Sequence, residues 1–79
     1  MNIDEATALK SNMHATFDSP QGKEVMLFLE KRCSWYDSVF VPTSPELTLV
    51  AAGRREVLAT IKTVMKYSPK QIVALQEDS

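Results

Sequence analysis

Three Ser-Pro dipeptides divide the chain into segments and constrain its fold more than any other feature. They are Ser19-Pro20, Ser44-Pro45 and Ser68-Pro69. A serine side chain can accept a hydrogen bond from a free backbone N–H at a helix start, and proline suits the next position because its missing N–H would have no partner there. Each pair therefore predicts the start of a helix. The residues after the three pairs share little, so the pairs indicate punctuation rather than a repeat.

Apolar residues recur at helical spacing after each pair and set the extent of the predicted helices. The pattern predicts a helix over residues 20–36, a second over 45–67 and a short third helix after Pro69. The two long helices would run antiparallel across a connection of about eight residues, from which Phe40, with Val39 or Val41, reaches the core. The sequence thus predicts an all-α fold, a helical hairpin with short helices at both ends.

The N-terminal segment has two interpretations. Leu9, Met13 and Phe17 lie four residues apart and predict a short helix within residues 4–17. That helix is either a fourth packing element or an arm that needs a partner. We therefore divide the chain into an N-terminal arm or short helix (1–15), a helical domain (16–76) and a tail (77–79).

The net charge and the distribution of apolar residues narrow the classes of function that the protein can have. Nine Lys and Arg residues against ten Asp and Glu give a formal charge of −1, whereas a duplex-binding domain usually has a basic excess. Nucleic acid is therefore possible but not favoured as a partner. The longest apolar run, VMLFL, is too short to span a bilayer, and the N-terminus lacks the pattern of a secretory signal, so we expect no membrane association.

No group of residues predicts catalysis. Cys33 is the only cysteine and His14 the only histidine, so neither a disulfide nor a closed Cys/His zinc site can form within one chain. Cys33 falls on the apolar face, His14 has no evident partner, and the surroundings of Gly53 lack a phosphate-binding loop. We expect neither an enzyme nor a bound cofactor or metal.

Four residues are predicted to have structural roles: Gly22, Arg32, Gly53 and Arg54. Arg54 falls within the apolar stripe of the 45–67 helix and needs a carboxylate there, for which the candidates are Asp18, Glu30 and Asp37. Arg32 is predicted to stack on an aromatic ring. Gly53, next to Ala51 and Ala52, permits a close backbone approach, either to the first long helix or to another subunit.

A second set of residues is predicted to contact another molecule. Arg55 lies opposite Arg54 on the helical wheel and lines up with Lys62 and Lys66. This basic ridge is either a solvated face or a contact for an acidic protein surface or nucleic acid. The expected anchors for a protein partner are apolar and aromatic: Leu9, Met13, Leu27, Trp35 and Tyr36.

The order of these residues resembles a family of small helical domains encoded by tailed bacteriophages, of the Bordetella-phage virion-module type. Its pattern has a Phe and a Gly before an apolar helix, then a Cys and a Phe, and then a Gly-Arg-Arg tripeptide that opens an apolar second half. The matching positions lie within residues 16–75: Phe17, Gly22, Val25, Leu29, Cys33, Phe40, Gly53, Arg54, Arg55, Val57 and Ile61.

The resemblance implies a phage protein whose gene lies in the virion-structure region of short-tailed phages, and it supplies no catalytic residues. Our leading hypothesis is a non-enzymatic protein that docks onto other proteins as a minor virion or particle-assembly component and forms homo-oligomers. The alternative is an early phage inhibitor of a host enzyme or defence complex. A third hypothesis is a weak nucleic-acid-binding module. The expected location is the virion or the host cytoplasm.

Overall fold

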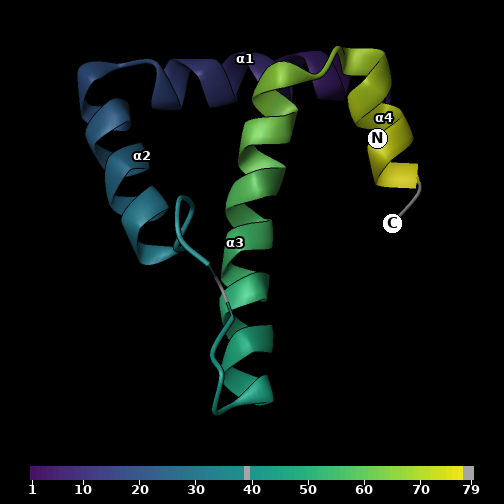
Figure 1. Ribbon diagram of the computed structural model, residues 1–79. Helices are drawn as coiled ribbons and strands as arrows, with labels where there is room; N and C mark the ends of the chain where they lie inside the picture. Colours follow the sequence, from purple (N-terminus) through teal and green to yellow (C-terminus); the bar gives the residue numbers. More distant parts are fainter. Residues whose placement is uncertain (39, 78–79) are drawn as a thin grey trace.

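The computed structural model describes residues 1–38 and 40–77, and this part of the chain consists of four α-helices and their connections (Figure 1). The helices are α1 (Ile3–Phe17), α2 (Pro20–Arg32), α3 (Pro45–Lys66) and α4 (Pro69–Glu77). The all-α prediction is therefore confirmed. The expected contribution of Val39 to the core and the end of the predicted tail, residues 78–79, lie outside the described residues.

Each Ser-Pro pair starts a helix, as predicted. In all three, the serine Oγ accepts a hydrogen bond from the backbone N–H three residues later: Ser19 from Gly22 at 3.0 Å, Ser44 from Leu47 at 3.2 Å and Ser68 from Gln71 at 3.2 Å. The start of α1 is closed differently, by a capping box between Asn2 and Glu5. Each of the four helix starts thus has a local side-chain partner for one of its free N–H groups.

Helix α1 lies across one end of the molecule, and the other three helices pack against it (Figure 1). Helices α2 and α3 extend from it in opposite chain directions, which makes them the antiparallel pair that the sequence predicts. The molecule is flat, with extents of 46 × 33 × 13 Å. Its radius of gyration, 14.6 Å, exceeds the roughly 12 Å expected of a compact domain of this length.

The core lies where α1 meets the end of α3 and the start of α4. Ala6, Val64 and Ile72 are buried there, and the partly buried residues around them are Leu9, Met13, Tyr67 and Val73. The N-terminal segment is therefore a packed helix. Leu9 and Met13, which we expected on a docking face, instead face the protein's own core because α1 crosses directly over α3 and α4.

Helix α2 ends four residues earlier than predicted. The chain leaves the helix through Ser34, which has a positive φ of 53°. The Trp35 N–H donates to the Glu30 carbonyl at 2.9 Å and the Ser34 N–H to the Lys31 carbonyl at 3.3 Å, the two bonds of a Schellman motif. Glycine usually marks this position, and here serine occupies it. The connection to α3 is consequently longer than expected and spans residues 33–44.

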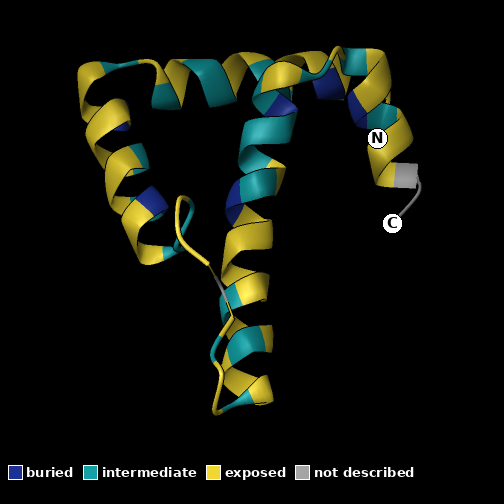
Figure 2. Ribbon diagram, in the orientation of Figure 1, coloured by how far each residue is buried: buried dark blue, intermediate teal, exposed yellow. Residues whose placement is uncertain are grey.

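Many apolar residues that the pattern places in the core are exposed (Figure 2). The largest of them lie on α2, on the connection and on α3 as far as its middle: Val25, Phe28, Phe40, Leu47, Val50 and Val57. The prediction that Phe40 reaches the core is wrong, and Val41 is only half-buried. The physical reason is the position of α1, which packs on the C-terminal end of α3 and leaves the apolar stripe of its N-terminal half exposed.

Candidate protein-docking surface

Two side chains of α1 hold the last turn of α3. Lys10 Nζ donates to the Tyr67 carbonyl at 2.6 Å, and His14 Nε2 donates to the Met65 carbonyl at 2.8 Å. Carbonyls at the end of a helix have no partner within it, and cations are favoured there by the helix dipole. These two bonds fix the angle at which α1 crosses α3. The sequence indicates no partner for His14, and the only signal it offers is the four-residue spacing that places Lys10 and His14 on one face of α1.

His14 also joins α1 to the corner that precedes α2. Its Nδ1 lies 2.8 Å from Asp18 Oδ2. Both ring nitrogens therefore face acceptors, which only the doubly protonated ring can satisfy with two donors. The hydrogen bond to Asp18, and then the one to the Met65 carbonyl, raise the pKa of His14 above its ordinary value.

Two cations of the predicted basic ridge are turned toward the end of α2. Arg55 Cζ lies 4.5 Å and Lys62 Nζ 4.8 Å from the centroid of the Trp35 ring. Lys62 also pairs with Glu30 at 2.8 Å, and Tyr36 donates its hydroxyl to the same carboxylate at 3.1 Å. We call these five residues the Trp35 clamp. Within the ridge, only Lys66 is left exposed without such a contact to an aromatic ring or carboxylate of the described residues.

The clamp places a carboxylate in a nearly buried position. Glu30 is 8% exposed, and burial alone would raise its pKa. The hydrogen bond from Lys62, supported by the one from Tyr36, outweighs this burial and lowers the pKa of Glu30. The clamp is thus a satisfied polar network that holds α2 and α3 together, and it leaves few ridge charges for an external phosphate.

Arg54 and Arg32 do not have the environments that we predicted. Both are exposed. Within the described residues Arg54 has no carboxylate partner, and Glu30, one of its candidate partners, binds Lys62. The stripe around Arg54 is itself uncovered, so its charge needs no internal compensation. Arg32 does not stack on Trp35, because Arg55 and Lys62 occupy that position.

The two glycines have different surroundings. Gly22 is buried at the corner between α1 and α2, where an added Cβ would overlap the Thr16 carbonyl oxygen and lie 2.7 Å from Phe17 Cα. The helices can meet at this corner only because Gly22 has no side chain. Around Gly53, apart from its neighbours and the backbone of its own helix, no atom of the described residues lies within 4 Å of an added Cβ. The predicted approach of Gly53 to the first long helix is therefore wrong.

An open cleft of about 550 Å³ lies between α2 and α3, next to the end of α1. Four apolar and four charged side chains line it: Phe17, Met26, Leu27 and Met65, with Asp18, Lys23, Glu30 and Lys62. We call it the α2–α3 cleft. Leu27, one of the predicted anchors, is 58% exposed. Two of the apolar residues are methionines, whose flexible side chains adapt to different partner shapes.

The remaining predicted anchors are placed unequally. Trp35 is half-buried and held by Arg55 and Lys62, which makes it a structural residue of the clamp. Tyr36 is 81% exposed although its hydroxyl is bonded to Glu30. Leu27 and the Tyr36 ring are therefore the predicted apolar and aromatic anchors that remain accessible.

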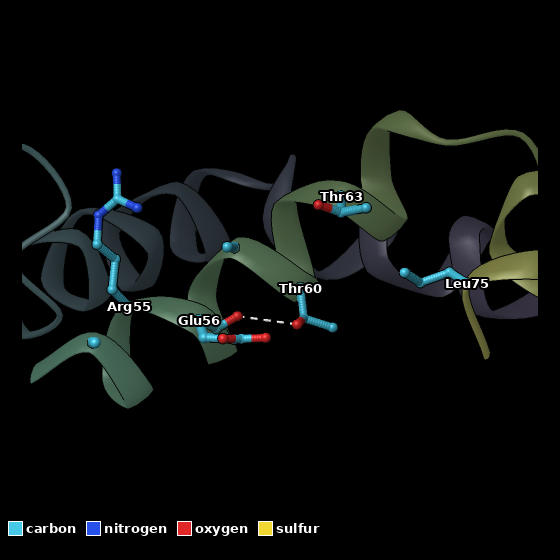
Figure 3. Close-up of a pocket in the computed structure, with 7 residues that line it drawn as sticks. Arg55, Glu56, Thr60, Thr63 and Leu75 are labelled. Carbon is cyan, nitrogen blue, oxygen red and sulfur yellow. Dashed lines mark hydrogen bonds between the residues drawn. The ribbon is translucent and has the colours of Figure 1, made fainter. Parts of the chain in front are cut away.

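A second hollow, of about 390 Å³, follows α3 and reaches Leu75 of α4 (Figure 3). One of its polar groups is engaged within α3, since the Thr60 hydroxyl donates to the Glu56 carbonyl at 3.0 Å. Arg55 points away from both residues in Figure 3. Among the described residues no group of three or more His, Cys, Asp and Glu side chains is arranged to hold a metal ion.

Comparison with known proteins gives one match. The model of the Bbp19-like phage protein family matches residues 13–77, which include α2, α3, α4 and every position that carries the resemblance noted from the sequence. No curated protein and no solved structure matches the chain. In the part of the chain that the structure describes, none of the helices has the length and apolar character needed to cross a membrane.

Proposed function

Because the chain belongs to the Bbp19-like phage protein family, we propose that it is a non-enzymatic docking protein, a minor virion or particle-assembly component. The observation that carries this proposal is the imbalance between its buried and exposed apolar side chains. Four hydrophobic residues of the described chain are buried: Ala6, Leu58, Val64 and Ile72. Twelve large ones are exposed, Leu27, Phe28, Tyr36 and Val57 among them. Exposed apolar surface on this scale is typical of a protein that is covered by a partner.

The α2–α3 cleft is the surface best suited to that partner. Leu27 lines this open hollow together with Met26, Met65 and Phe17. A partner helix could place an apolar anchor in such a cleft, as in helix-in-groove recognition. Lys23 and Asp18 at the same cleft provide charges of both signs, which would set the orientation of the partner.

The Trp35 clamp favours a protein partner over nucleic acid. Arg55 and Lys62 contact the Trp35 ring, and Lys62 is neutralised by Glu30. Binding a phosphate backbone would require these cations to leave their present partners. The clamp instead gives the cleft a rigid wall, which reduces the ordering cost of docking.

The test uses the phage that encodes the protein. Particles and assembly intermediates are purified from infections with the wild-type gene, a Leu27→Asp variant and a Leu49→Asp control, and the protein is quantified by mass spectrometry. Leu49 is 72% exposed and lies outside the cleft. We expect wild type and Leu49→Asp in the particles or intermediates, and loss of Leu27→Asp although its circular dichroism is unchanged.

Two results would contradict the proposal. One is absence of the wild-type protein from both mature particles and intermediates. The other is recovery of the protein in a stoichiometric complex with a host enzyme, early in infection, which would favour the host-directed inhibitor.

A further inference from the structure

We propose that the uncovered face of α3 is a homodimer interface, and that a second copy of this chain covers it in an antiparallel arrangement. Leu47, Val50, Arg54, Val57 and Ile61 follow one another at alternating intervals of three and four residues. This is the spacing of the a and d positions of a coiled coil, where two helices pack knobs into holes. We call these five residues the α3 seam.

The α3 seam has no cover within its own chain. Leu47, Val50 and Val57 are 57%, 49% and 65% exposed. Arg54 is also exposed, and Ile61 is half-buried where the seam approaches the packed end of α3. An apolar stripe on a helix normally faces another element, and no element of the described residues covers the apolar members of this one.

The accessible surface of the protein exceeds that of a compact monomer of the same mass by about the area that one chain buries in a dimer interface. A compact monomer of this mass has an accessible surface of roughly 4,800 Å², whereas this chain exposes 5816 Å². The excess is close to the ~800 Å² that each partner buries in an interface of standard size. One interface of ordinary dimensions would therefore bring the chain to the surface expected of a protein of its mass.

A second copy fits the seam better than an unrelated helix because the seam is self-complementary. If Leu47 of one copy packs against Val57 of the other, the twofold axis passes at the level of residue 52. Ala51 and Gly53 flank the seam at that level, and they are among the smallest residues of α3. A glycine within a helix costs about 1 kcal/mol relative to alanine. No contact inside the chain accounts for Gly53, whereas a close crossing of two helices does.

The charges select the antiparallel orientation. In this pairing Arg54 lies beside Val50 of the second copy, one helical turn from that copy's Glu46, so opposite charges can meet at the edge of the seam. In a parallel pair the two Arg54 side chains would face each other at the centre, which is unfavourable. The net charge of −1 opposes self-association only weakly.

This interface is separate from the α2–α3 cleft and does not depend on the proposed function. Leu27 is not a seam residue, so Leu27→Asp should dimerise like the wild type even though it loses its docking partner. Loss of particle association and loss of dimerisation can therefore be measured independently.

The mass of the protein in solution tests the dimer. Sedimentation equilibrium from ~1 to ~200 µM detects a dimer whose dissociation constant is micromolar or lower, as is typical of an interface of this size. Wild type and the Leu49→Lys control should both convert from the mass of one chain, 8.9 kDa, to twice that mass. Val57→Lys should stay monomeric over the whole range with its helical circular dichroism retained. A monomeric wild type, or a Val57→Lys variant that dimerises normally, would overturn the proposal.

Disulfide cross-linking tests the orientation. In a background in which Cys33 is replaced by serine, Leu47→Cys and Val57→Cys are oxidised separately and as an equimolar mixture. The antiparallel seam predicts a disulfide-linked dimer in the mixture and little in either variant alone. Cross-linking of each variant with itself would indicate a parallel pair and overturn the arrangement.

Discussion

The two halves of α3 have similar apolar patterns and opposite surroundings. In the C-terminal half Val64 is 5% exposed and packs with Ala6 and Ile72 under α1 and α4. In the N-terminal half Leu47 and Val50 occupy the same stripe and are 57% and 49% exposed. An amphipathic pattern therefore shows which face of a helix can be buried, but the element that buries it is decided by where the other helices cross. For the N-terminal half, the element that we propose is a second copy of the chain.

The same contrast between packed and exposed positions distinguishes the two glycines, Gly22 at the corner between α1 and α2 and Gly53 in α3, and predicts the largest effect. Gly22→Ala should destabilise the protein by at least about 3 kcal/mol, at the upper end of the overpacking range, because the new methyl group meets backbone atoms that cannot move aside. Gly53→Ala should stabilise the monomer by about 0.5–1 kcal/mol, since it adds helix propensity in open space. Urea unfolding of both variants measures these values, and effects of the same sign would contradict the contrast.

Truncation of an apolar side chain should destabilise the protein more in the C-terminal half of α3 than in the N-terminal half, and this is the second largest effect. Val64→Ala should cost about 2 kcal/mol, because it removes buried methyl groups and leaves a cavity. Leu49→Ala removes a larger side chain, but Leu49 is 72% exposed, so the cost should stay below about 0.5 kcal/mol. Thermal unfolding of both variants provides the measurement. A larger cost for Leu49→Ala would mean that the N-terminal half is covered within the monomer.

The Trp35 clamp lies between the two halves and should have an intermediate effect. Lys62→Met should cost about 1–2 kcal/mol, because it leaves the nearly buried Glu30 carboxylate with Tyr36 alone. The pKa of Glu30 is lowered in the folded state, so its contribution is present above its unfolded value near 4.5 and is lost as the pH falls through the folded value. Acid titrations of wild type and Lys62→Met, followed by Trp35 fluorescence, should therefore differ below pH 4.5. Coincident curves would contradict the ion pair.

The adjacent arginines give a smaller contrast. Arg55→Ala should cost about 0.5–1 kcal/mol through the lost contact with the Trp35 ring, whereas Arg54→Ala should change the stability of the monomer by less than about 0.5 kcal/mol. This order is the reverse of the one expected from the helical wheel alone. Unfolding curves of both variants, recorded at a concentration that keeps the chain monomeric, measure the two losses of stability. A larger loss for Arg54→Ala would support the prediction that Arg54 faces the core.

These residues show what the sequence could and could not predict. The helix starts were predictable because Ser19, Ser44 and Ser68 act through hydrogen bonds only three residues long. The end of α2 was not, because Ser34 takes a left-handed conformation that usually requires glycine. Local sequence signals therefore predict a helix start or end where the residue is the type usually found there, and fail where another type takes its place.

Long-range partners account for the remaining differences. The wheel correctly placed Arg54 and Arg55 on different sides of α3, but it carried no information about which side another element approaches. Trp35, which engages Arg55, lies beyond the end of α2 and belongs to a connection whose path no periodicity describes. Likewise the partners of Lys10 and His14 are backbone carbonyls more than 50 positions away, which no side-chain pattern can reveal. The phage family was recognisable because it depends on residue order rather than on packing.

The weakest predicted effect concerns His14, at the packed end of α3. Its pKa is raised in the folded state, chiefly by the hydrogen bond to Asp18 and then by the Met65 carbonyl, which together outweigh the opposing effects of desolvation and, less, of Lys10. A raised folded pKa means that the contribution of His14 to stability is complete below its unfolded value near 6.5 and is lost as the pH rises through the folded value. The melting temperature of the wild type should therefore decrease slightly between pH 6 and 8. His14→Asn should lack this decrease, and Asp18→Asn should show less of it because the main cause of the shift is gone. Leu49→Ala, in the N-terminal half of α3, is the control and should keep the wild-type dependence of the melting temperature on pH. Parallel curves for wild type and His14→Asn would show that the contact between α1 and α3 does not depend on the charge of His14.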